Sequence, residues 1–92
     1  MARNFKILTA NQGDRSLRLH LLGDFDGTSA HELANTLDRY GSSFARVDVD
    51  TDGLRNINSF GLEVFITKLK RMRRIPVRIC FLGRFKYNFA EE

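Results

Sequence analysis

Three segments of the sequence alternate apolar and polar residues, and each of them has one strongly apolar face. The apolar positions are Leu17, Leu19 and Leu21 in the first segment, Val47 and Val49 in the second, and Val77, Ile79 and Phe81 in the third. Alternation with a period of two is typical of a β-strand that buries one face. Strands covered by helices on both faces are instead continuous runs of Val, Ile and Leu. The alternation therefore predicts a sheet with helices on one face and a largely open opposite face.

The polar positions of the same segments should lie on the open face of the sheet. They are Arg18, His20, Asp48, Asp50 and Arg78. Opposite charges on neighbouring strands attract each other across a sheet, so we expect cross-strand charge pairs among these residues. His20 fits such a polar ladder better than a metal site, because the second histidine, His31, falls in a predicted helix elsewhere.

Two other segments have the three-and-four spacing of apolar residues that is typical of amphipathic helices. The apolar stripes are Ala30, Leu33, Ala34 and Leu37 in the helix predicted from Ser29 to Tyr40, and Leu62, Phe65, Ile66, Leu69 and Met72 in the helix predicted before Arg74. Ser29 and Glu32 have the spacing of a capping box at the start of the first helix. Asn58 and Ser59 both have short polar side chains that suit the cap of the second helix.

The predicted elements follow in the order strand, strand, helix, strand, helix, strand. A first strand at 5–10 is joined to the second by a turn at 11–14, the third strand covers 44–50, and the fourth follows Pro76. This order predicts an α/β fold, a mixed four-stranded sheet with two helices packed on one face and two right-handed crossovers. A chain of 92 residues with 42% hydrophobic residues is expected to form one domain over residues 1–92. After the fourth strand, Phe85, Tyr87 and Phe89 leave room for one more short segment.

Phe60 and Val64 lie four residues apart and outside the apolar stripe of the second helix. Large apolar side chains at the exposed edge of a helix start are typical of a contact surface. The sequence therefore predicts an interaction surface in residues 56–64, formed by the loop from Asn56 to Ser59 and the first turns of the helix. The alternative is that the Phe60 ring folds back over residues 54–57.

No pattern of catalytic, metal-binding or cofactor-binding residues competes with this surface. Asp24 and Asp26 form a pair of carboxylates, but no base, nucleophile or phosphate loop accompanies them, so a role in a turn and at a helix start is favoured. Gly61 stands alone at its helix start and forms no nucleotide-binding motif. Cys80 is the only cysteine, which excludes an internal disulfide and favours a small buried thiol in a strand. We therefore expect no enzymatic activity, no metal and no cofactor.

The positive charge of the chain is concentrated late in the sequence. The net charge is +4, and Lys68, Lys70, Arg71, Arg73, Arg74 and Arg78 lie between the end of the second helix and the fourth strand. Cations at the C-terminal end of a helix complement its dipole. A nucleic-acid-binding surface over residues 68–78 is the alternative, but no aromatic residues are interleaved with these cations.

The N-terminal residues have no apolar run long enough for a signal peptide, and no later segment has the length of a membrane span. We expect a cytoplasmic protein without a membrane partner.

Two stretches together resemble the STAS domain, a fold shared by bacterial anti-sigma factor antagonists and the cytoplasmic ends of sulfate transporters. The first is Leu22-Gly23-Asp24-Phe25-Asp26 followed by Thr28-Ser29-Ala30, similar to the family's turn after the second strand. The second runs from Val49 to Leu54 and then from Ile57 to Leu62, similar to the family's third strand, loop and helix start. The resemblance extends over roughly residues 5–82, and the pair of motifs is more specific than either alone.

The resemblance implies a protein partner, namely an anti-sigma factor or a related regulator. In the family a serine just before the helix glycine is phosphorylated by a partner kinase, and this position is Phe60 here. Asn58 stands where the family has Asp, and Ser59 matches the first serine of the pair. The resemblance then allows constitutive binding, a switch by phosphorylation at Ser59, or a role outside the kinase circuit. The family also adds a strand and a long helix after the fourth strand, so we expect a C-terminally shortened domain with an uncovered sheet edge that favours a homodimer.

These observations lead to one main hypothesis and two alternatives. The main hypothesis is a non-enzymatic module of the anti-sigma factor antagonist type that binds a regulatory protein. Its expected contact residues are Asp26, Asn58, Ser59, Phe60 and Val64. The alternatives are a self-assembling scaffold protein and, less favoured, a nucleic-acid-binding domain that uses residues 68–78.

Overall fold

Four strands form one mixed sheet, in the spatial order β1-β2-β3-β4. The computed structural model describes residues 4–72 and 77–89. The elements are β1 (Lys6–Gly13), β2 (Ser16–Phe25), α1 (Gly27–Tyr40), β3 (Arg46–Ile57), α2 (Ser59–Arg71), β4 (Arg78–Leu82) and α3 (Lys86–Phe89). β1 is antiparallel to β2, and β2, β3 and β4 are parallel to one another. The predicted order of strands and helices is thus confirmed, with the short α3 added after β4.

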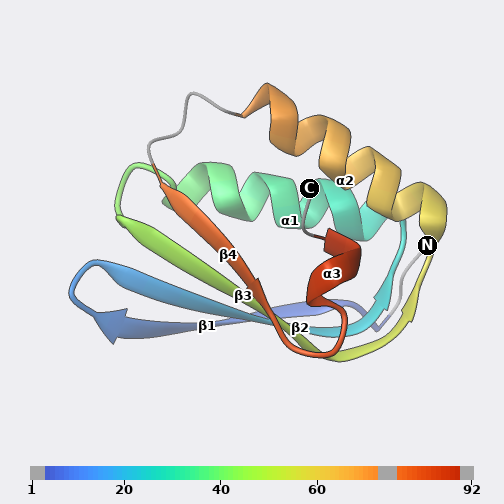
Figure 1. The fold of residues 1–92 in the computed structure, drawn as a ribbon, viewed down its shortest axis with the longest axis horizontal. Coiled ribbons are helices and arrows are strands. Elements are labelled where there is room, and N and C mark those ends of the chain that lie inside the picture. Colours follow the sequence, from blue (N-terminus) through green and yellow to red (C-terminus); the bar gives the residue numbers. More distant parts are fainter. Residues whose placement is uncertain (1–3, 73–76, 90–92) are drawn as a thin grey trace.

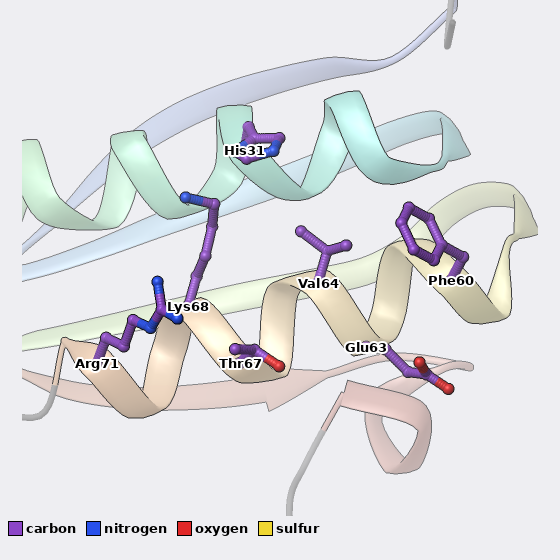
Figure 2. A pocket seen from close by; sticks show the side chains of 7 residues that line it. All are labelled: His31, Phe60, Glu63, Val64, Thr67, Lys68 and Arg71. Carbon is purple, nitrogen blue, oxygen red and sulfur yellow. The ribbon is translucent and has the colours of Figure 1, made fainter.

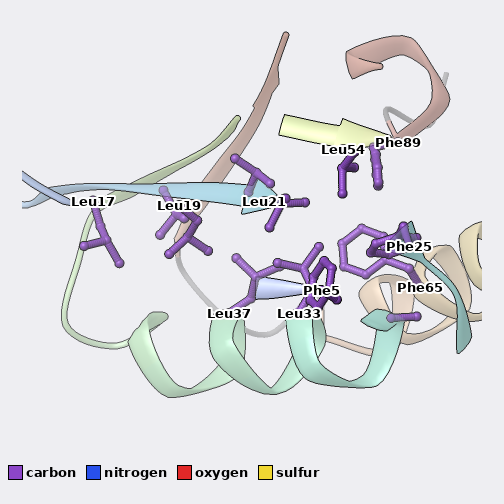
Figure 3. Close-up of a cluster of buried hydrophobic side chains, with 13 residues drawn as sticks. Phe5, Leu17, Leu19, Leu21, Phe25, Leu33, Leu37, Leu54, Phe65 and Phe89 are labelled. Atoms are coloured by element: carbon purple, nitrogen blue, oxygen red, sulfur yellow. The ribbon is translucent and has the colours of Figure 1, made fainter. Parts of the chain in front are cut away.

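Helices α1 and α2 lie on the same side of the sheet (Figure 1). Buried leucines fill the space between β2 and α1, and Figure 3 shows Leu33 and Leu37 of α1 pointing toward Leu19 and Leu21 of β2. All four of these side chains are fully buried. The alternation of the strands therefore predicted the two-layer arrangement correctly, because one face of each strand supplies this core.

The polar ladder on the open face is confirmed at two cross-strand pairs. Arg18 is aligned with Asp48 and His20 with Asp50, at distances of 3.8 Å between Arg18 Nη2 and Asp48 Oδ2 and 3.2 Å between His20 Nδ1 and Asp50 Oδ2. A third pair joins Arg46 Nε to Asp48 Oδ1 at 2.7 Å within β3.

The predictions for β4 are only partly confirmed, because Arg78 lies on the open face as expected but is not aligned with an acidic residue, and Cys80 is not the buried thiol that was expected. Arg78 is aligned with Arg46, so this register places two like charges opposite each other. Cys80 lies across from Asp48 on the open face and is partly exposed, not buried. The odd-numbered residues of β4 face the helices, which leaves Cys80 on the side that no helix covers.

Two strands are longer than the sequence indicated. β1 continues to Gly13, and the hairpin turn falls at Asp14 and Arg15, whose φ angles of 52° and 61° are those of a tight two-residue hairpin turn. β3 continues past Asp50 to Ile57, because it pairs with the second half of β2 as far as Phe25. The expected loop from Asn56 to Ser59 is consequently the end of β3 followed directly by the helix cap.

An aromatic cluster closes the core at the end where α2 and α3 meet the sheet. The Phe89 ring of α3 is fully buried, with its centroid 4.9 Å from that of Phe25, 5.5 Å from that of Phe81 and 5.9 Å from that of Phe65. Phe89 therefore covers the apolar side chains at this end of the core. β4 remains at the edge of the described sheet, as expected.

The apolar stripe of α2 is only partly buried. Phe65 is fully buried, whereas Leu62, Ile66, Leu69 and Met72 keep part of their surface exposed. Helix α2 packs mainly beside α1 rather than flat on the sheet, which explains the difference.

Candidate protein-interaction site

Asn58 is the residue that starts α2. Its Oδ1 accepts a hydrogen bond from the N–H of Gly61 at 3.0 Å, which satisfies one of the free N–H groups of the first turn. The N–H of Asn58 donates to the carbonyl of Phe25 at 2.8 Å and so ties the cap to the end of β2. Ser59 is the first residue of the helix and is exposed, so the interpretation of Ser59 as the cap was wrong.

Asp26 has the same role at the start of α1. Its Oδ1 accepts a hydrogen bond from the N–H of Ser29 at 3.0 Å and lies 3.2 Å from the Ser29 hydroxyl. The Ser29 N–H holds the pKa of the Asp26 carboxyl below its ordinary value of 3.8. The capping box predicted at Ser29 and Glu32 was wrong, because α1 begins two residues earlier and Ser29 lies buried inside the first turn.

Asp24 is engaged in a separate contact at the end of the sheet. Its Oδ1 accepts a hydrogen bond from Asn56 Nδ2 at 3.1 Å and lies 3.6 Å from Arg55 Nη2. The Asp24 carboxylate therefore binds residues at the end of β3, and the Asp26 carboxylate caps the start of α1. Among the described residues, 4–72 and 77–89, no group of three His, Cys, Asp or Glu residues is arranged to hold a metal ion.

The starts of α1 and α2 are in direct backbone contact. A Cβ added at Gly61 would lie 2.6 Å from the carbonyl carbon of Asp26, closer than real Cβ atoms come to a neighbour, so this approach requires glycine. The Phe60 ring lies against Gly27, where an added Cβ would be 3.5 Å from its Cε2 atom. The structure thus brings Asp26, Asn58 and Phe60 together, although Asp26 and Asn58 are more than 30 residues apart in the sequence.

The Phe60 side chain points outward, as the sequence predicted. It is 67% exposed, and with Leu8 and Tyr87 it is one of three large hydrophobic side chains exposed in the described part of the chain. Val64 is partly buried and packs against the core, so its contribution to an outer surface is smaller than expected.

A groove runs beside Phe60 between α1 and α2. It has a volume of about 370 Å³ and is lined by His31, Phe60, Glu63, Val64, Thr67, Lys68 and Arg71. Figure 2 shows Phe60, Val64 and Lys68 projecting from α2 toward α1, while Glu63 points away. Four of these residues lie outside the predicted surface at 56–64, namely His31, Thr67, Lys68 and Arg71. Phe60, Val64 and Lys68 are spaced by four residues and therefore lie along one face of the helix. This spacing is the sequence signal that could have placed Lys68 in the site.

No described helix has both the length and the apolar character needed to cross a membrane.

Solved structures match this fold, whereas sequence comparisons do not find a match. No family model matches the sequence, and no curated protein matches it. An anti-sigma factor antagonist STAS domain from Rhodobacter sphaeroides matches with a TM-score of 0.67 and 14% identity, covering 98% of this chain and 95% of that chain. An anti-sigma factor antagonist from Mycobacterium paratuberculosis has a TM-score of 0.66 and 15% identity, covering 87% of this chain and 68% of that chain. The anti-sigma factor antagonist SpoIIAA in its unphosphorylated form has a TM-score of 0.63 and 10% identity, and the match covers 85% of this chain and 70% of that chain.

These matches establish the class of fold. The chain has a STAS-like domain fold, with the open mixed sheet and the strand and helix order of that class, as the resemblance of its two motifs predicted.

Proposed function

We propose that this chain is a non-enzymatic protein-interaction module that binds a regulatory protein, an anti-sigma factor or a related regulator, in the cytoplasm of a bacterial cell. The fold it shares with anti-sigma factor antagonists supports a protein-interaction role. The contact surface comprises residues 56–64 together with the neighbouring start of α1 at Asp26.

The exposed ring of Phe60 is the observation that carries this proposal. A phenyl ring that is 67% exposed leaves apolar area in water. The backbone that carries it is held by the Asn58 cap and by the close approach of Gly61 to the backbone of Asp26. Burial of such a ring in a partner contributes on the order of 2 kcal/mol from apolar area alone.

Regulation at this site differs from that implied for the family, because a phenyl ring cannot accept a phosphate. Ser59 has an exposed hydroxyl group at the first position of α2 and is the candidate for phosphorylation. A phosphate there would add roughly two negative charges next to Phe60. We propose that the unmodified chain binds its partner and that phosphorylation of Ser59 weakens the contact.

Substitution of Phe60 tests the proposed function. Phe60→Ser and Phe60→Asp should leave the domain folded, and partner binding should fall by about tenfold or more with Ser and further with Asp, which adds the cost of burying a charge. Tyr87→Ser is the matched control, because Tyr87 is 77% exposed but lies on α3. Tagged wild type and variants would be purified from the native cell, and the co-purified protein quantified by mass spectrometry.

Retention of the partner by Phe60→Ser at the wild-type level would exclude the contact. If both Phe60 variants unfold while binding per folded molecule is unchanged, the ring belongs to the core and does not form the contact.

Self-assembly through the sheet edge is a second candidate. It is favoured by the position of β4 at the edge of the described sheet, where an unpaired strand can join a second copy. Light scattering distinguishes the two candidates, because a stable monomer excludes the scaffold.

Nucleic-acid binding has less support, because the cations do not share one surface. Lys68 and Arg71 project from α2, whereas Arg78 lies on the open face of the sheet.

A further inference from the structure

The groove beside Phe60 extends along most of the contact between α1 and α2. A second hollow of about 230 Å³ shares Lys68 and Arg71 with the first and continues toward Ala34 and Met72. The combined groove therefore starts at the exposed Phe60 ring and continues past Lys68 toward the C-terminal end of α2.

The chemical character of the groove changes along its length. Phe60 and Val64 make the end near the helix starts apolar, whereas Lys68 and Arg71 carry positive charge one and two turns further along α2. No ion pair of Lys68 or Arg71 occurs within residues 4–72 and 77–89. In Figure 2 the Lys68 side chain extends across the groove toward His31 of α1. Asp38 is the one acidic residue that lines the second hollow.

We propose that this groove takes an acidic amphipathic segment of a protein partner. The segment places an apolar side chain on Phe60 and Val64 and a carboxylate between Lys68 and Arg71. This inference rests on the proposed function and adds the chemistry of the partner to it. Charge complementarity favours an acidic segment, since the cations have no protein partner in the described part of the chain and the whole chain has a net charge of +4.

The spacing of the groove residues sets the spacing required in the partner. Phe60 and Lys68 are eight residues apart in α2, which corresponds to about 12 Å along the helix axis at about 1.5 Å per residue. A helical partner segment spans this distance in about two turns. The apolar anchor and the carboxylate should therefore lie about seven or eight residues apart on one face of a partner helix.

Two synthetic peptides with opposite charges test the inference on the full chain. Both are amphipathic helical peptides of about four turns with the same leucine anchor, and they carry either Glu or Lys about two turns from it. Each is titrated into ¹⁵N-labelled protein while amide resonances are recorded. We expect the Glu peptide to shift the signals of His31, Val64 and Lys68, and to bind at least tenfold more tightly than the Lys peptide.

Charge reversal in the protein should reverse this preference. The double substitution Lys68→Glu and Arg71→Glu should weaken the Glu peptide at least tenfold and strengthen the Lys peptide. Lys70→Glu is the matched control for one charge reversal, because Lys70 is exposed on the same helix but does not line the groove. It should change the affinity for either peptide less than twofold.

Equal binding of both peptides, shifts outside the groove, or no binding would overturn the inference. A change in binding free energy with Lys70→Glu of about half that of the double variant would mean that net charge alone acts. Displacement of the Glu peptide by a DNA or RNA oligonucleotide would point to nucleic acid instead. The proposed function is tested separately. If the co-purified partner is lost with Phe60→Ser but retained by the double Glu variant, the interaction module stands and the acidic partner segment does not.

Discussion

Asn58 and Ser59 are adjacent polar residues with different roles at the start of α2. Asn58 has extended backbone angles, with φ −86° and ψ 129°, which point its side chain back at the N–H of Gly61. Ser59 already has helical geometry, so its hydroxyl group is outside the capping position. One residue of difference in the helix start thus separates a side chain that caps the helix from one that does not.

Substitution by alanine should distinguish these roles. We expect Asn58→Ala to lower the free energy of unfolding by about 1 kcal/mol, because an N–H of the first turn loses its acceptor. Ser59→Ala should change it by less than about 0.5 kcal/mol, because the site is exposed and alanine favours the helix. Urea unfolding followed by circular dichroism measures both values. A larger loss with Ser59→Ala than with Asn58→Ala would contradict this assignment of the cap.

Helices α1 and α2 depend on each other through their starts. The backbone of Asp26, which caps α1, is also the surface on which Gly61 of α2 lies. The Asp26 cap therefore holds both α1 and the support beneath the proposed contact surface. Because the pKa of its carboxyl is lowered in the fold, we expect the stability of this support to depend on pH.

The pH dependence of stability should change when Asp26 is replaced by Asn. The N–H of Ser29 lowers the pKa of Asp26 in the folded chain, so the charged cap stabilises the fold above the ordinary pKa of 3.8 and this contribution is lost as the pH falls through the folded value. Asn caps a helix about as well as Asp but has no titrating charge. We therefore expect similar stability at pH 7 and a smaller loss in Asp26→Asn than in wild type below about pH 4.

Urea midpoints measured from pH 7 down to pH 3 give this difference, and the contributions of the other carboxylates cancel in the comparison. Parallel losses of stability in the two proteins would show that the Asp26 charge does not contribute.

Helix α3 has only four residues, but it completes the hydrophobic core of the whole molecule. Phe89 contacts the rings of Phe25, Phe65 and Phe81 and so joins β2, α2 and β4 in one cluster. The hydroxyl group of Thr51 supports the same region, since it donates to the carbonyl of Leu82 at 2.7 Å and accepts from the N–H of Phe85 at 3.0 Å. Phe89, and in part Phe85, therefore belong to the core, although both follow β4.

Removal of the Phe89 ring should destabilise the entire fold. We expect Phe89→Ala to lower the free energy of unfolding by about 3–5 kcal/mol, because it leaves a cavity among three aromatic rings. This is a large part of the roughly 5–15 kcal/mol that stabilises a typical domain. Tyr87→Ala, in the same helix but 77% exposed, is the control and should cost less than about 1 kcal/mol. Thermal unfolding compares the two variants, and equal effects would show that α3 does not complete the core.

Local patterns in the sequence determined most of the fold. The alternation of Leu17, Leu19 and Leu21 depends only on the geometry of a strand, and it correctly predicted which face is buried and which carries Arg18 and His20. Helix periodicity also favoured the outward position that the Phe60 ring has. The face of a strand or helix on which a side chain lies is set by the local backbone geometry. The sequence was therefore sufficient to predict these faces.

Contacts between distant segments decided the rest. The helix start at Asp26, the extension of β3 to Ile57 and the burial of Phe89 each depend on a partner in another element. Lys68 resembles any cation near a helix C-terminus until α2 packs beside α1, and only then does it line a groove with His31 and Phe60. The sequence by itself determined the layers and the exposed ring, whereas the tertiary structure decided the caps, the closed end of the core and the groove, because long-range packing selects among residues that are locally equivalent.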